Sequence, residues 1–161
     1  MKDIITVLKL INDNPLRVYI GEGMIDNLTV SLHSEQLPNN NVNLLKKLPK
    51  QYLEFLQFSN GLEFYNSGDH RFHPLDEVLA LQKSYGFNEN VFPIGYFLED
   101  TVLLVLDQST RGYSIYVGSN LLLDEFILLE HDFKEFLENL LIHNCSNFWI
   151  HFNDENYYDF S

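Results

Sequence analysis

The chain has 161 residues, of which 45% are apolar and 14% aromatic, a composition that predicts one packed domain over residues 1–161 and argues against disorder. Lys and Arg number 10 against 23 Asp and Glu, so the formal net charge is −13. Because Lys and Arg supply most affinity for phosphate backbones and anionic lipid surfaces, this charge argues against nucleic-acid and membrane binding.

The first 43 residues predict a helix, short strands and a loop. Apolar residues recur at helical spacing over 4–11, with Asp3 as a cap, and the helix ends at an Asn-Asp-Asn-Pro run. Residues 16–20 alternate like a strand, and residues 28–32 alternate again, which predicts a second short strand. Residues 33–43 are polar and contain a proline and three consecutive asparagines, which is typical of a loop.

The next segment predicts two helices separated by a strand. Pro49 suits the first turn of a helix that carries an apolar stripe over residues 52–56, and Gly61 fits a left-handed C-terminal cap. Residues 62–65 then resemble a strand. A second helix is expected from Leu75 to Tyr85, because the segment follows a proline, has helical apolar spacing and ends at a glycine.

The remainder of the chain changes to an extended pattern before a final helix. Residues 91–97, 101–107 and 113–117 are rich in β-branched and aromatic residues and are joined by short turns, so we expect an antiparallel meander. Asp132 and Glu135 form a D-x-x-E capping pattern that predicts a helix. SNFWIHF (146–152) is expected to form a last strand, and residues 153–161 an acidic tail. The predicted class is α+β, a single domain with helices packed on an antiparallel sheet.

Charge is distributed unevenly along the chain. Residues 1–83 contain ten acids and eight bases, a net of −2, whereas residues 84–161 contain thirteen acids and two bases, a net of −11. Two interpretations remain open at this point: a solubilising surface, or an acidic face that steers a basic partner.

The histidines are candidates for metal ligands or for an acid–base pair. His70 and His73 lie close together, but Pro74 favours an extended backbone at His73, and the sequence does not supply two further ligands at zinc spacing. We therefore expect a solvated loop there and no metal site. His143 ends a predicted helix, where the helix dipole favours a cation.

The single cysteine, Cys145, cannot form an internal disulfide, which excludes a disulfide-stapled extracellular scaffold. It carries no recognisable nucleophile signature, so a buried structural thiol is expected. The N-terminal segment does not resemble a signal peptide, and no stretch approaches the roughly 18 apolar residues of a membrane-spanning helix. The expected location is the cytoplasm.

Motifs for catalysis and phosphate binding are weak. Gly21-Glu22-Gly23 lacks the third glycine of a dinucleotide fingerprint and places an acid where phosphate would bind. The adjacent acids Glu99-Asp100 and Asp124-Glu125 would point to opposite faces of a strand, which favours surface charge over paired catalytic carboxylates. We predict no catalytic residues, no cofactor and no metal.

Five segments resemble the SUKH superfamily, the Smi/Knr-type domain, in order and spacing over about three fifths of the chain. They are LPKQYLEFLQFSNGLEFY (48–65), HPLDEVL (73–79), VFPIGYF (91–97), TVLLVLDQSTRGYSIYV (101–117) and DFKEFLENLL (132–141). The chain departs from the pattern after VFPIGYF, where a glycine-rich acidic turn is common and this sequence has Phe97-Leu98-Glu99-Asp100. Residues 1–43 match poorly.

The resemblance implies an α+β domain that binds proteins and is not an enzyme. Bacterial members are commonly immunity proteins that neutralise polymorphic toxins by direct contact, and fungal members act in cell-wall regulation. The hypothesis is therefore a cytoplasmic protein that binds a basic cognate toxin, with a nuclease as one candidate. A homodimer is also compatible with the sequence.

The residues expected to contact the partner are acids predicted at strand ends or turns: Glu99, Asp100, Asp107, Asp124 and Glu125. The alternative is a regulatory module of the Smi/Knr type that binds a protein or a small ligand without a toxin partner. A third reading, an enzyme, would require a pocket of converging titratable groups with perturbed pKa values near His70 and His73.

Overall fold

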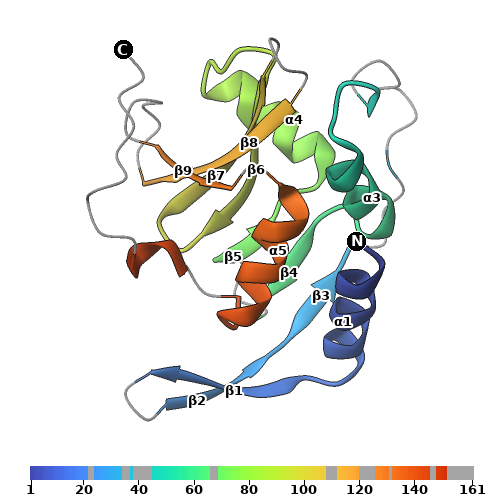
Figure 1. Cartoon of the computed structure of the whole chain (residues 1–161), viewed down its shortest axis with the longest axis vertical. Helices are drawn as coiled ribbons and strands as arrows, with labels where there is room; N and C mark the ends of the chain where they lie inside the picture. Colours follow the sequence, from blue (N-terminus) through green and yellow to red (C-terminus); the bar gives the residue numbers. More distant parts are fainter. Residues whose placement is uncertain are drawn as a thin grey trace.

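Strands of the computed structural model are joined mostly by short turns, and helices lie on both sides of them (Figure 1). The structure describes residues 1–21, 24–33, 37, 45–65, 69–107, 112–119, 126–130, 132–145 and 148–151. In chain order the elements are α1 (Lys2–Asp13), β1 (Leu16–Gly21), β2 (Met24–Leu28), β3 (Val30–Leu32), α3 (Lys50–Phe58), β4 (Leu62–Phe64), β5 (His70–Phe72), α4 (Leu75–Ser84), β6 (Val91–Phe97), β7 (Asp100–Asp107), β8 (Gly112–Gly118), β9 (Ile127–Glu130), α5 (Phe133–Ile142) and the 3-10 helix η3 (Phe148–His151).

Within the described part of the chain, the main sheet has seven strands in the order β3-β4-β5-β6-β7-β8-β9, and every neighbouring pair is antiparallel. The α+β class and the meander over residues 91–117 are therefore confirmed. β1 and β2 form a separate two-stranded ribbon that extends away from the main sheet (Figure 1). Among the described residues, no helix is long and apolar enough to span a membrane.

Alternation along the strands gives the main sheet two different faces. Phe72 and Phe97 point into the main core, whereas Arg71 and Tyr96, which pair across β5 and β6, point the other way. Helices α1, α3 and α5 cover the first face, called here the inner face, and α4 lies against the second, the outer face (Figure 1).

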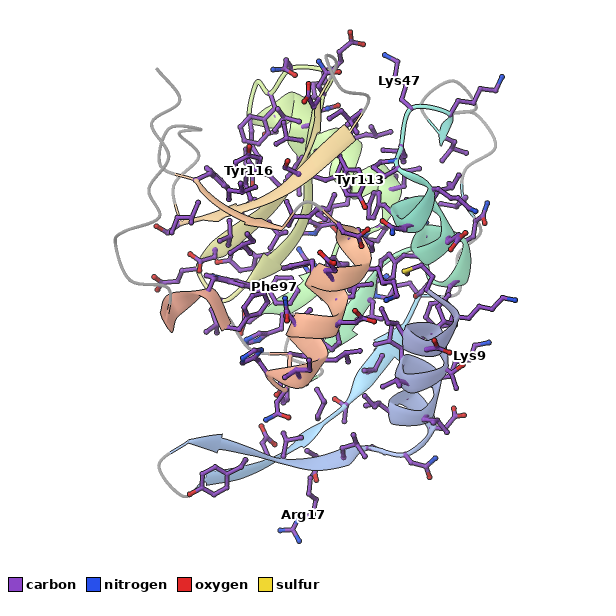
Figure 2. All side chains as sticks on the ribbon, viewed as in Figure 1. Lys9, Arg17, Lys47, Phe97, Tyr113 and Tyr116 are labelled. Carbon is purple, nitrogen blue, oxygen red and sulfur yellow. The ribbon has the colours of Figure 1, made fainter. Side chains whose placement is uncertain are left out.

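The inner face is packed with aromatic rings. Phe72 is fully buried and makes edge contacts with Phe55, Phe97, Phe133 and Phe136 at centroid separations between 5.1 and 6.1 Å. Figure 2 shows Phe97 directed into the body of the molecule. Edge-to-face packing adds to the hydrophobic gain of each ring, so this cluster contributes strongly to the stability of the fold.

The predicted helix ends are largely confirmed. α5 begins after Asp132, whose Oδ1 accepts hydrogen bonds from the backbone N–H groups of Lys134 (2.7 Å) and Glu135 (3.1 Å). α4 follows Pro74 and ends before Gly86, as expected. The predicted loop over residues 33–43 lies almost wholly outside the described residues, and the predicted tail over 153–161 lies outside them entirely.

Asp3 is not the cap of α1, because the helix begins at Lys2 after Met1 and Asp3 lies in its first turn. Three other sequence predictions are wrong in detail. Residues 28–32 are not one strand, because the chain leaves the ribbon at Leu28 and joins the main sheet at Val30. Gly61 is not the cap of α3, because that helix ends at Phe58 with an extended Ser59. Gly61 has φ +101°, and a Cβ there would lie 2.9 Å from the Pro74 nitrogen, so close approach to the start of α4 explains the glycine.

The third error concerns SNFWIHF, which contains the 3-10 helix η3 at Phe148–His151 and no strand among its described residues. Phe148 and Trp149 are adjacent in sequence and both are buried in the main core. A strand would direct adjacent side chains to opposite faces, whereas a helical turn allows both rings to pack against Phe136.

Candidate functional site

The predicted partner-binding acids do not form one cluster. Glu99 is exposed in the tight turn between β6 and β7, and Asp100 begins β7 beside it. Asp107 is exposed at the opposite end of β7, roughly 23 Å away at about 3.3 Å per residue. Asp124 and Glu125 lie outside the described residues.

The β6–β7 turn brings acids together with an exposed apolar side chain. Phe97 pairs with Asp100, so Leu98 and Glu99 form the tip of a two-residue hairpin. The backbone N–H of Leu98 donates to the carbonyl oxygen of Asp69 (2.6 Å), which places a third acid, exposed like Glu99, beside the turn, whereas Asp100 is half-buried. We call Asp69, Leu98, Glu99 and Asp100 the turn patch.

Leu98 has an unusual conformation for its side chain. Its φ is +57° and it is 48% exposed. The left-handed region costs an L-residue with a Cβ roughly 1–2 kcal/mol, and a glycine would avoid that cost. The chain therefore keeps an exposed leucine at the tip of the turn against the local conformational preference, and such strain is concentrated at functional positions.

Asp100 also has a structural role. Its Oδ2 accepts a hydrogen bond from the indole Nε1 of Trp149 (2.6 Å). Trp149 is buried and packs against Phe97, so the carboxylate anchors η3 to the end of the sheet. Glu99 is exposed and makes no such side-chain hydrogen bond to any residue that the structure describes, so it is the acid of the turn whose side chain is most available to a partner.

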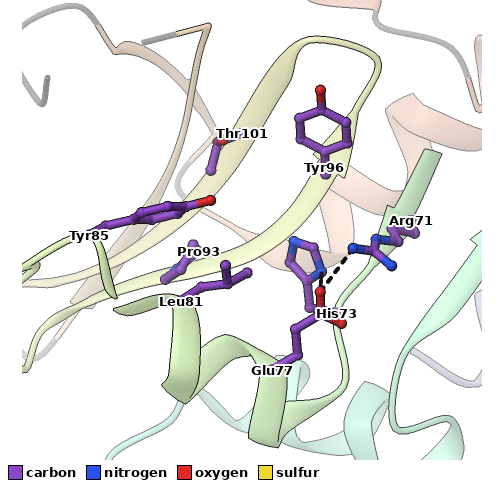
Figure 3. Close-up of a pocket in the computed structure, with 8 residues that line it drawn as sticks. All are labelled: Arg71, His73, Glu77, Leu81, Tyr85, Pro93, Tyr96 and Thr101. Carbon is purple, nitrogen blue, oxygen red and sulfur yellow. Dashed lines mark hydrogen bonds and ion pairs between the residues drawn. The ribbon is translucent and has the colours of Figure 1, made fainter. Parts of the chain in front are cut away.

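A pocket of about 210 Å³ lies on the outer face, between α4 and strands β5 to β7 (Figure 3). Its polar side chains come from segments that are distant in sequence. They are Arg71 of β5, His73 just after it, Glu77 in α4, Tyr85 at the end of α4, Tyr96 of β6 and Thr101 of β7.

Glu77 links two of these residues. Its Oε1 accepts a hydrogen bond from Nη2 of Arg71 (2.9 Å) and lies 3.2 Å from Nδ1 of His73. Arg71 and Glu77 are each about one third exposed, whereas the His73 side chain is 5% exposed. Nε of Arg71 and Nδ1 of His73 are buried without an aligned hydrogen-bond partner. The pocket therefore contains polar atoms that the protein leaves incompletely satisfied.

The expectation of a solvated loop at His70 and His73 is wrong. His70 lies in β5, and His73 is buried with its backbone N–H bonded to Ile94 (2.9 Å). Burial, together with the positive charge of Arg71, lowers the pKa of His73 to about 4. The imidazole is thus neutral near pH 7 and a weak base, whereas general-base catalysis is most effective with a pKa near the working pH.

The sequence does not predict this pocket, because none of its residues belongs to a recognisable ligand-binding motif. The signals were the alternation of Arg71-Phe72-His73, which places a cation and an imidazole on one face, and the four-residue spacing from His73 to Glu77. Neither spacing reveals that β6 and β7 supply the opposite wall of the pocket. That wall forms because Arg71 pairs with Tyr96 and Tyr96 pairs with Thr101 across the sheet.

The second histidine and cysteine cluster shows a structural arrangement. Cys145 is fully buried, and burial raises the pKa of its thiol, which disfavours the nucleophilic thiolate. Nδ1 of His143 lies 2.7 Å from the carbonyl oxygen of Asn139, at the end of α5. Within the described part of the chain, no group of three or more His, Cys, Asp or Glu residues is arranged to hold a metal ion.

Comparison with known proteins places these features in a family. Searches of curated proteins and of solved structures each found no match. The model of the SMI1 / KNR4 family (SUKH-1) matches residues 43–139, which include α3, the whole meander and most of α5. α1, the ribbon and β3 precede the matched segment. Because the match covers more than half of the sequence, the chain belongs to the SMI1 / KNR4 family (SUKH-1).

Proposed function

We propose that this chain is an immunity protein that acts in the cytoplasm, where it binds a basic cognate toxin one to one and neutralises it by direct contact. Family membership is compatible with this role. The observation that carries the proposal is the turn patch, in which the exposed acids Asp69 and Glu99 lie beside an exposed leucine on a protein of net charge −13.

The turn patch has the composition of a small protein-binding surface. Glu99 and Asp69 are exposed and supply negative charge, which accelerates encounter with a basic surface. Leu98 projects at the tip and offers apolar area that can be fully desolvated in a complex. A nuclease toxin is one candidate partner, because a cleft that binds phosphates is basic and carboxylates can occupy it.

The first experiment is a pulldown with the full chain from its native cells, washed at about 50 mM and about 500 mM salt. The proposal predicts one basic protein, encoded by a neighbouring gene, whose recovery falls as screening increases. Co-expression should then restore growth to cells that produce this protein. Capture of a partner that survives high salt would contradict the electrostatic mechanism, and failure to restore growth would contradict immunity.

A second candidate function is a regulatory module that binds a ligand without a toxin partner. The outer-face pocket favours it, because a buried histidine with unsatisfied polar atoms is directed to a cavity. A salt-insensitive partner that is unrelated to a toxin would support this candidate over the first.

A further inference from the structure

The pocket on the outer face is lined by a buried histidine, His73, whose Nε2 has no hydrogen-bond partner among the described residues. The His73 side chain is 5% exposed and directs its ring into the cavity (Figure 3). Among the described residues, its backbone N–H bonds to Ile94, its Nδ1 contacts Glu77, and the charge of Arg71 acts on its ring. Nε2, on the other side of the ring, points away from Glu77 toward the middle of the pocket (Figure 3).

The contact with Glu77 determines which ring nitrogen carries the proton. Nδ1 lies 3.2 Å from a carboxylate oxygen of Glu77, although the two are not aligned as a hydrogen bond. A lone pair on Nδ1 would be repelled by that oxygen, so the proton of the neutral ring resides on Nδ1 and the lone pair on Nε2. Nε2 can therefore accept a hydrogen bond from a ligand.

The pocket offers no net charge to an ionic ligand. Nη2 of Arg71 lies 2.9 Å from Oε1 of Glu77, so these two opposite charges already compensate one another. An ion of either sign would lose its hydration on entry without gaining an uncompensated counter-charge. An uncharged donor avoids this penalty and still satisfies Nε2.

Size and wall chemistry limit the ligand further. The volume of about 210 Å³ is below the roughly 300–1,000 Å³ of pockets that enclose drug-sized molecules. Leu81 and Pro93 supply apolar surface on one side, and the ring of Tyr85 extends over the cavity (Figure 3). A flat ring packs well against such surfaces.

We propose that this pocket binds a small, uncharged, planar molecule, such as an aromatic amide or a nucleobase, that donates an N–H hydrogen bond to Nε2 of His73. The ring of the ligand packs against Leu81, Pro93 and Tyr85. This inference goes beyond the immunity role and does not depend on it, because the site is complete within the isolated chain.

The test is a matched series of one-ring probes titrated into the ¹⁵N-labelled full chain at pH 7 and observed by NMR. Benzamide carries the neutral N–H donor, N,N-dimethylbenzamide lacks the donor, and benzoate and benzamidinium carry opposite charges on the same ring. We expect benzamide to bind in the range of about 0.1–10 mM, as suits a fragment of its size. The other three probes should bind at least about tenfold more weakly.

Two readouts keep the result independent of folding defects. In the wild-type chain, the His73 ring should show a protonated Nδ1 and a bare Nε2, and benzamide should move the Nε2 signal toward the protonated position. Leu81→Trp should fill the cavity and weaken benzamide binding at least about tenfold, whereas Ala80→Trp, at an exposed neighbouring position on α4, should not.

Several results would overturn the inference. They are no probe reaching the pocket signals at its solubility limit, equal or tighter binding of a charged probe, a protonated Nε2 in the free protein, or equal effects of the two tryptophan variants. Because no toxin is present in these titrations, such a failure leaves the immunity proposal to its own test.

Discussion

The two faces of the main sheet are built from the same strands, but one forms the packed core and the other lines a pocket. On the inner face, Phe72 and Phe97 are fully buried among aromatic rings. On the outer face, the neighbouring residues Arg71 and Tyr96 are half-buried beside a cavity. Two residues that are adjacent in one strand can therefore have different roles, because alternation directs one side chain to the core and the other to the pocket.

Hydrogen bonding adds to this contrast at the cavity. On the inner side, Gln51 is paired, because its Nε2 donates to Oδ2 of Asp132 (2.7 Å) and its Oε1 accepts from Tyr113, although the buried hydroxyl of Tyr52 has no hydrogen-bond partner among the described residues. On the outer face, buried nitrogen atoms of Arg71 and His73 lack aligned partners, and both residues line the pocket. Incomplete satisfaction costs stability, so two such atoms beside one cavity are a reason to assign a binding role there.

The largest expected effect is on the inner face. Phe72→Ala should reduce the free energy of unfolding by about 3–5 kcal/mol, because it removes a buried ring and leaves a cavity. Tyr96→Ala, on the outer face, should cost about 1 kcal/mol. Urea denaturation of both variants measures the difference. Equal losses would contradict the division of the sheet into a packed face and a binding face.

The next effect concerns the pH dependence of stability. The pKa of His73 is about 4 when folded against an ordinary value of about 6.5, so between these values the unfolded chain binds a proton that the native chain does not. Stability should therefore decrease as pH falls from about 6.5 to about 4, by at most about 3 kcal/mol.

Unfolding measured at intervals between pH 7 and pH 4 tests this dependence, with His73→Gln as the matched variant, because glutamine does not titrate. The variant should lose most of the slope in this window. Asp132 acts at lower pH: burial tends to raise its pKa, but the hydrogen bond from Gln51 and those from the backbone outweigh burial and hold the pKa below its usual value. An unchanged slope in His73→Gln would show that His73 is not the titrating group.

A smaller effect is expected at the start of α5, which covers the inner face. Asp132→Ala removes the acceptor of two backbone N–H groups and should cost about 1 kcal/mol. Asp132→Asn retains a capping oxygen and should cost less, which thermal denaturation at pH 7 can measure. If both variants lost the same stability, the cap would not be the cause.

The smallest effect on stability is expected at Leu98. Leu98→Gly relieves the left-handed strain but adds flexibility to the unfolded chain, so the two terms should cancel to within about 1 kcal/mol. Affinity for the toxin should nonetheless fall about tenfold, because the exposed apolar side chain is lost. A variant that binds as tightly as the native chain would remove Leu98 from the interface.

Local patterns predicted much of the fold. The D-x-x-E pattern at Asp132 located the start of α5, because a helix cap depends only on neighbours in sequence. Proline and glycine located α4 for the same reason. The prediction was wrong at Phe148 and Trp149, where burial of adjacent rings against α5 decides the conformation and no local signal reports it.

The candidate sites depend more on pairing than on local pattern. Glu99 could be assigned to a turn from sequence, but Asp69 joins it only through a backbone bond to Leu98. The pocket forms where β5, α4, β6 and β7 meet. The sequence around His73 does not report this meeting, and it predicts a solvated loop where the structure has a buried side chain. The family model includes all these positions, but a family match does not state which side chains face one another.

The most direct test of the proposed function is the affinity of the toxin for two charge reversals at opposite ends of β7. Glu99→Lys changes the turn patch, and Asp107→Lys makes the same change roughly 23 Å away. We predict that Glu99→Lys weakens binding at least about tenfold at about 100 mM salt and that Asp107→Lys weakens it less than about threefold. Equal effects of the two reversals, or none from Glu99→Lys, would contradict binding through the turn patch.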